Sequence, residues 1–146
     1  MKRELITFEA SNELFGLDIN AIREIRAWSP VTRMPKVPDY VAGVVNLRGA
    51  VLPVIDLSAR LGWQRTEATQ RHAIIVVQID SAACGFIVES VSDIVELDLD
   101  GLQPPPTSVE GAAARFIEGI APVNDQLITV LDPISLIEDG HIAEVC

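Results

Sequence analysis

The chain has 146 residues, a formal net charge of −10 and an apolar content of 49%. This length fits one ordinary domain or two very small ones, and the apolar content argues against wholesale disorder. The acidic balance argues against a nucleic-acid binder, which needs clustered Lys and Arg. Because no apolar run reaches about eighteen residues and no secretory signal begins the chain, we expect no membrane insertion. The only cysteines, Cys84 and Cys146, lie far apart, which fits a reducing cytoplasm better than a disulfide framework.

The charge is divided unevenly along the sequence. Residues 1–71 hold ten Lys or Arg and eight Asp or Glu, a net of +2. Residues 72–146 hold one Arg and thirteen acids, a net of −12. Solubility is the simpler explanation of such a surface. The alternative is that the two halves meet different partners.

The first half predicts two hairpins with a short turn and a connector between them. Strands are expected at residues 5–10 and 14–19, and Asn20 can cap one helical turn after them. A connector follows at residues 28–38, where three prolines forbid a long helix. Residues 43–57, G-V-V-N-L-R-G-A-V-L-P-V-I-D-L, then predict two short strands joined by a tight Arg-Gly turn. Both faces of this hairpin are apolar, so we expect both to be covered.

The second half repeats this plan at fixed offsets. Over the first hairpin and the turn after it the offset is 69, as from Gly16 to Gly85. Over the second hairpin the offset is 76, as from Gly43 to Gly119. The difference of seven residues is an insertion in the second connector, where insertions are tolerated. We therefore read the chain as two copies of one small unit.

Two such copies predict a mainly β fold with short helices. About five short strands per copy can remove their edges by closing into a small barrel. A barrel of roughly 70 residues is marginal alone, so two packed together explain the two-sided apolar pattern. We expect one domain over residues 1–146, with barrel one at about 12–70 and barrel two at about 72–135. The terminal strands and the C-terminal helix are free to cross between them.

No pattern of catalytic or metal-ligating residues stands out. The two histidines, His72 and His141, lie away from the cysteines and from each other. Nucleophile-elbow and phosphate-loop motifs are absent from the sequence. A serine–histidine–aspartate triad assembled in space stays open. On balance we expect no enzyme, no cofactor and no metal site.

Two features suggest a protein-binding surface. Arg48, at the hairpin turn, is either a solvated turn residue or an interface residue paired with a carboxylate, for which Glu24 is the candidate. Four apolar residues at matching positions of the two copies are either core or the lining of a groove that takes a partner's helix. The core is the simpler explanation for these four, which are Ile22, Ile25, Val91 and Ile94.

Five segments together resemble the CheW family, the coupling proteins of bacterial chemotaxis signalling. The resemblance runs from about residue 5 to 137, and its most specific block is N-L-R-G-x-V-x-P-V-I-D-L. The segments are I-R-E-I-R-A (22–27), G-V-V-N-L-R-G (43–49), V-L-P-V-I-D-L (51–57), G-F-I-V-E-S-V-S-D-I (85–94) and L-I-T-V-L-D (127–132).

This resemblance implies two SH3-like five-stranded barrels joined face to face and no catalysis. It implies a cytoplasmic scaffold, recruited to membrane-associated receptor arrays, that links the cytoplasmic tip of methyl-accepting chemoreceptors to the regulatory domain of the histidine kinase CheA. In that scheme the first barrel pairs with the kinase domain, and the receptor tip lies in the groove between the barrels.

The resemblance also assigns residues by position. It implies partner binding by Glu24, Gly43, Asn46, Arg48 and Gly49, with an ion pair between the glutamate and the arginine. It places Ile22, Ile25, Val91 and Ile94 at the receptor groove more loosely. In the second half Asn124-Asp125 replaces the arginine–glycine turn, so that turn's binding chemistry is not duplicated. Two alternatives stay open: an adaptor of the same fold in another kinase pathway, such as motility or second-messenger control, and a small-ligand-binding β-barrel.

Overall fold

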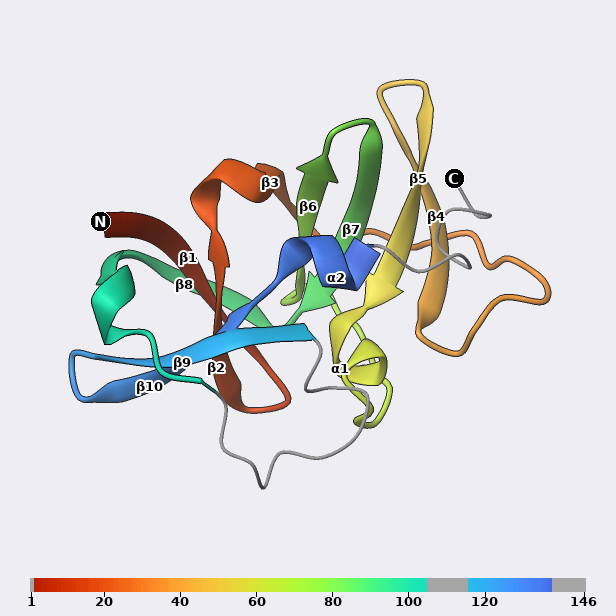
Figure 1. Cartoon of the computed structure of the whole chain (residues 1–146). Coiled ribbons are helices and arrows are strands. Elements are labelled where there is room, and N and C mark those ends of the chain that lie inside the picture. The colour runs from red at the N-terminus through yellow and green to blue at the C-terminus, as the bar shows by residue number, and fades with distance from the viewer. Residues whose placement is uncertain (1, 105–115, 138–146) are drawn as a thin grey trace.

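Ten strands form two five-stranded sheets in the computed structural model, which describes residues 2–104 and 116–137 (Figure 1). The first sheet has the order β8-β1-β2-β10-β9 and the second β3-β6-β7-β5-β4. The strands are β1 (Lys2–Ala10), β2 (Glu13–Asp18), β3 (Ile22–Ala27), β4 (Val41–Leu47), β5 (Ala50–Asp56), β6 (Ala73–Ile79), β7 (Ala82–Val88), β8 (Ser90–Asp98), β9 (Ile117–Val123) and β10 (Gln126–Leu131).

Four short helical elements lie wholly within the described residues. They are η1 (Ile19–Ala21), α1 (Leu57–Arg60), η2 (Leu99–Gly101) and α2 (Pro133–Ile137). The helical turn expected after the first hairpin is η1, but Asp18 caps it instead of Asn20, because the turn begins two residues earlier than expected. Across the described part of the chain, no helix has the length and apolar character needed to span a bilayer. The expected mainly β fold with two five-stranded units is confirmed.

The two copies exchange their first hairpins. The first sheet combines β1 and β2 with β8, β9 and β10, and the second combines β6 and β7 with β3, β4 and β5. After each first hairpin only a few residues precede the next strand, so the chain crosses to the other sheet at that point. The boundaries expected from the sequence, about 12–70 and 72–135, therefore differ from the membership of the sheets. Figure 1 shows the first sheet at the lower left, the second at the upper right, and α2 between them.

The strand register reproduces the sequence repeat residue by residue. In the second sheet Val54 pairs with Gly85 on one side and Gly43 on the other. In the first sheet Val130 pairs with Gly16 and with Gly119, which are the matching positions at offsets of 69 and 76. Two copies of one unit are therefore confirmed, and a two-fold pseudosymmetry relates the sheets.

Each sheet curls until its edges approach. Thr32, just beyond the edge strand β3, exchanges two backbone hydrogen bonds of 2.8 Å with Val44 on the opposite edge strand, β4. Gln103, beyond β8, pairs in the same way with Ile120 on β9. These links between opposite edges are what an SH3-like barrel requires, since curling removes exposed strand edges.

Three apolar clusters fill the molecule. One lies inside the second sheet, one inside the first, and the third joins the two, and we call this third cluster the seam. Neighbouring residues of β5 serve different clusters: Val54 faces the inside of its sheet and Ile55 faces the seam. This explains why residues 43–57 are apolar on both faces. The seam includes Phe8, Phe15, Leu17, Ile55, Leu57, Ile75, Val77, Phe86, Phe116, Leu131 and Leu136.

Candidate protein-binding surface

The turn between β4 and β5 has a geometry that displays Arg48. Leu47 pairs with Ala50, which leaves a two-residue loop, and both loop residues have positive φ angles, 52° for Arg48 and 85° for Gly49. Two positive φ angles define the type I′ turn that suits a twisted hairpin. The Asn46 side-chain oxygen accepts a 2.9 Å hydrogen bond from the Gly49 backbone N–H and holds the turn closed. Arg48 therefore projects from a rigid tip.

The expected Glu24–Arg48 ion pair is present. Arg48 Nη1 donates to Glu24 Oε1 and Nη2 donates to Glu24 Oε2, each at 3.1 Å. The two residues belong to opposite edges of the second sheet, so the pair links the two edges where that sheet curls on itself. The arginine side chain is 68% exposed and the glutamate side chain 23%. A pair this exposed adds little stability, and its main effect is to fix the direction of two charged groups.

The fold itself requires Gly43. A β-bulge lies at this residue, and a Cβ added there would be 2.3 Å from the carbonyl oxygen of Thr32. A Cβ added at the matching Gly119 would be 2.6 Å from Leu102 Cγ and 2.7 Å from the carbonyl oxygen of Gln103. Glycine at these two positions thus allows the close approach that curls each sheet. A Cβ added at Gly49 would meet no atom within 4 Å, so that glycine is needed for its turn angle instead. Gly43 therefore contributes to the site indirectly, by allowing the backbone geometry of the strand that leads to the Arg48 turn.

The four residues expected at a groove share one face of their sheets. Ile22 and Ile25 pair with Val77 and Ile75, which both face the seam. A bulge between residues 22 and 24 keeps the two isoleucines on that same face despite their spacing of three. The mates Val91 and Ile94 pair with Phe8 and Ile6 across an equivalent bulge in β8.

Burial divides these four residues into two kinds. Ile22 and Val91 are half-buried against the seam, so the expectation that they are core holds for this pair in part. Ile25 and Ile94 lie beyond the seam and remain 39% and 54% exposed. The apolar face between the sheets thus continues outward on both edge strands, as a groove for a partner requires.

One apolar residue of this surface was missed in the sequence. Val51 pairs with Asn46, follows the Arg48 turn and is 67% exposed. Its repeat mate Leu127 is 68% exposed at the same place on the other hairpin. Two features of the sequence could have predicted this exposure. Val51 and Leu127 occupy the same position in the two copies, and the alternation of strand residues that buries Leu52 points Val51 outward.

Polar side chains do not converge on a reaction centre in the described residues. No three His, Cys, Asp or Glu side chains among residues 2–104 and 116–137 are grouped as metal ligands. Of the two histidines, His72 accepts a 3.0 Å hydrogen bond from the Thr69 backbone N–H at Nδ1, and His141 lies outside the described residues. The buried carboxylate of Asp56 is fully used, accepting from the N–H and hydroxyl of Thr66 at 2.6 and 2.8 Å.

Two curled β-sheets with a packed seam, an ion-paired turn and exposed apolar strand residues define the class of protein-binding scaffolds. The family model of the CheW-like domain matches residues 4–141, so the chain belongs to the CheW-like family.

Individual relatives agree with this assignment. The chain is 44% identical to the chemotaxis protein CheW of Rhizobium meliloti (strain 1021), over 89% of this chain and 84% of the relative. It is 27% identical to the protein PilI of Pseudomonas aeruginosa, over 79% of this chain and 65% of that relative. The crystal structure of the scaffolding protein TtCheW from Thermoanaerobacter tengcongensis superposes with a TM-score of 0.85 at 33% identity, covering 97% of this chain and 91% of that one.

Proposed function

We propose that this protein is a non-catalytic scaffold that couples methyl-accepting chemoreceptors to the histidine kinase CheA in bacterial chemotaxis. The observation that carries the proposal is the Glu24–Arg48 pair, displayed on a rigid turn beside exposed apolar residues. Interfaces of this kind combine an apolar floor with a few charged residues of fixed geometry. Membership of a family whose relatives are named chemotaxis proteins supports the same function.

The two partners would use different surfaces. The second sheet, with the Arg48 turn, would pair with the regulatory domain of CheA. The groove lined by Ile22, Ile25, Val91 and Ile94 would take the helical cytoplasmic tip of the receptor, because its exposed apolar residues continue the seam. Such a scaffold acts in the cytoplasm at receptor arrays. It passes a receptor's conformational change to the kinase through contacts that differ between signalling states.

An adaptor of another chemosensory kinase pathway is the second candidate. The similarity to a relative named PilI favours this candidate, because it shows that proteins similar to this chain are not all named CheW. A small-ligand-binding barrel has less support, because buried apolar side chains such as Leu52, Val54, Ile128 and Val130 fill the interiors of the sheets.

The test is the substitution Arg48→Glu. It places a negative charge beside Glu24 and removes the interface arginine, so we expect the Kd for the CheA regulatory domain or for a receptor-tip fragment to rise at least about thirtyfold. The thermal melt followed by circular dichroism should stay within a few degrees of wild type. Binding is measured with purified partners.

Asn124→Glu is the matched control for this test. Asn124 occupies the same place in the other hairpin turn and has a φ angle of 50°, close to the 52° of Arg48. The control should keep wild-type affinity for the partner that Arg48→Glu loses. Unchanged affinity of Arg48→Glu for both partners would remove Arg48 from the proposed interface.

A further inference from the structure

A wide hollow lies away from the Arg48 turn and the four groove residues. It has a volume of about 990 Å³ and opens between the β1–β2 turn, α1, the link from Gly62 to His72, and the residue that joins β7 to β8. Trp63 lies in its wall and is 45% exposed. The Trp63 ring meets the Phe15 ring at 5.8 Å between centroids, so contact with the core supports one side of the indole.

Three carboxylates line the same hollow as this indole. Glu13, Glu67 and Glu89 line the hollow and come from three separate segments of the chain. The one cation in the lining, Arg65, is directed elsewhere: its guanidinium donates to the backbone oxygen of Asp39 at 3.2 and 3.4 Å. The hollow therefore presents an aromatic ring within a negative potential.

The repeat provides an internal comparison. The matching place in the other copy holds Asp80, Ser81 and Ala82 where this one has Ser11, Asn12 and Glu13, and Ile134 replaces Ser58. That counterpart has a volume of only about 240 Å³ and is lined mainly by small and apolar residues. The other copy thus forms the same arrangement of strands and turns without a wide hollow lined by three glutamates and a tryptophan, so folding does not require one.

We propose that the hollow is a second interaction surface, which takes an arginine-bearing basic segment of a partner protein, with the guanidinium over Trp63. Arginine stacks on indole through cation–π attraction, and its five donors suit surrounding carboxylates. Charge complementarity of this kind selects a basic partner and repels an acidic one. Residues 138–146 of the chain hold three acids and neither Lys nor Arg, so they have the wrong charge for this hollow.

The experiment titrates the whole protein with the probe peptide acetyl-Ala-Arg-Ala-Arg-Ala-amide at low salt. The two tryptophan indole N–H signals are followed by NMR, and Trp28, which packs against the second sheet's interior, is the internal reference. We expect a saturable shift of the Trp63 signal alone and no shift with the glutamate version of the peptide. A Trp63 signal that does not move, or that moves equally with both peptides, overturns the proposal.

A pair of charge-matched variants separates this site from general attraction to an acidic protein. The site variant carries Glu13→Gln, Glu67→Gln and Glu89→Gln, and we expect it to raise the peptide Kd about fivefold. The control variant removes three charges outside the lining of the hollow and should stay within twofold of wild type. Equal weakening by both variants overturns the proposal. The control substitutions are Glu4→Gln, Glu96→Gln and Asp125→Asn.

This inference does not depend on the proposed chemotaxis function. Arg48→Glu should leave peptide binding unchanged, since its turn lies outside the lining of the hollow. The peptide titration and the kinase and receptor binding tests can therefore fail separately.

Discussion

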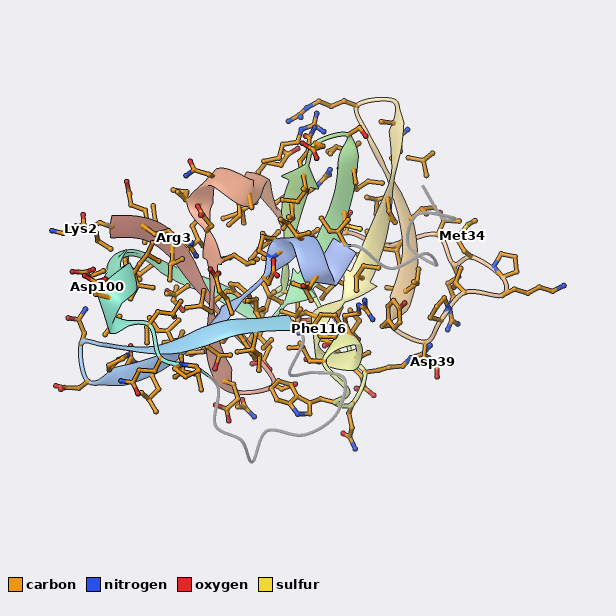
Figure 2. The ribbon with its side chains drawn as sticks, viewed as in Figure 1. Lys2, Arg3, Met34, Asp39, Asp100 and Phe116 are labelled. Atoms are coloured by element: carbon orange, nitrogen blue, oxygen red, sulfur yellow. The ribbon has the colours of Figure 1, made fainter. Side chains whose placement is uncertain are left out.

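Arg60 on α1 holds a buried positive charge between the two sheets. The residue is only 8% exposed. Its guanidinium carbon lies 4.4 Å from the ring centroids of both Tyr40 and Phe116. These two rings are repeat mates at the offset of 76, and they precede β4 and β9 in different sheets. Figure 2 shows Phe116 near the centre of the molecule. Arg60 thus joins the two copies across their pseudosymmetric interface.

The expected cost of removing this arginine follows from its burial. A desolvated cation–π contact is worth about 2 kcal/mol, so Arg60→Ala, which loses two contacts and a packed stem, should lower the free energy of unfolding by about 4 kcal/mol. Arg60→Met keeps much of the volume and should lose less, because replacing a buried charge with a hydrophobic residue also removes a desolvation cost. The energy of the ring contact itself is therefore best measured as a coupling between two substitutions.

The assay is urea unfolding followed by tryptophan fluorescence for Arg60→Met, Phe116→Leu and the double variant. We expect a coupling energy of about 1–2 kcal/mol, because removing either partner removes the same contact. Arg60→Met combined with Val51→Ala, at an exposed hairpin position, should be additive. A coupling below about 0.3 kcal/mol between Arg60 and Phe116 would refute the reasoning, since it would match what distant, independent residues show.

Three further substitutions test local features. Gly43→Ala, which brings a Cβ against a carbonyl oxygen, should lower the free energy of unfolding by about 3 kcal/mol in urea titrations, and a neutral result would contradict the close approach. Thr66→Val removes the hydroxyl that donates to buried Asp56 and should cost about 1–2 kcal/mol, with faster amide exchange in the link that Thr66 belongs to. The pKa of Lys2 is raised from 10.5, first by its hydrogen bond to Glu96 and then by the charge of that carboxylate. Glu96→Gln should lower this pKa in NMR titrations, and the small stabilisation by the pair should fade as pH rises through the folded-state pKa of Lys2.

The sequence predicted the elements that local chemistry determines. Gly16 and Gly85 established one offset of the repeat, and both occupy equivalent positions in the parallel strand pairs of the two sheets. The arginine–glycine turn was predicted because a two-residue hairpin loop needs positive φ angles. The Glu24–Arg48 pair followed from the expectation that a closed sheet would bring its edges together.

The exchange of hairpins between the copies was not predictable in the same way. Because the copies are alike, a first hairpin fits the strand pairing of either sheet, and periodicity does not state which one it joins. The deciding feature is the length of the chain after each first hairpin. Glu89 alone separates β7 from β8, which leaves the chain no room to return to its own sheet.

The exposure of Ile25 and Ile94 could not be predicted from local sequence patterns either. Apolar residues are usually core, and both lie on the face that packs into the seam. A bulge at Arg23 and its equivalent in β8 keeps them on that face, and a bulge has no reliable sequence signal. Their exposure depends on how far the opposite sheet extends, which only the assembled fold determines.

The hairpin exchange also changes the meaning of the uneven charge. Dividing the chain in the middle gives +2 and −12, but the second sheet with its connectors, residues 19–88, holds eight Lys or Arg and five acids, a net of +3. The rest of the chain then holds three Lys or Arg and sixteen acids, a net of −13. Among the described residues alone, the division by sheet gives +3 for residues 19–88 and −10 for residues 2–18, 89–104 and 116–137, whereas the division at residue 71 gives +2 and −9. Assigning charge by sheet thus increases the contrast, with the Arg48 turn on the basic unit. Because long-range fields steer encounters, we expect acidic partners to meet the second sheet and basic partners the first.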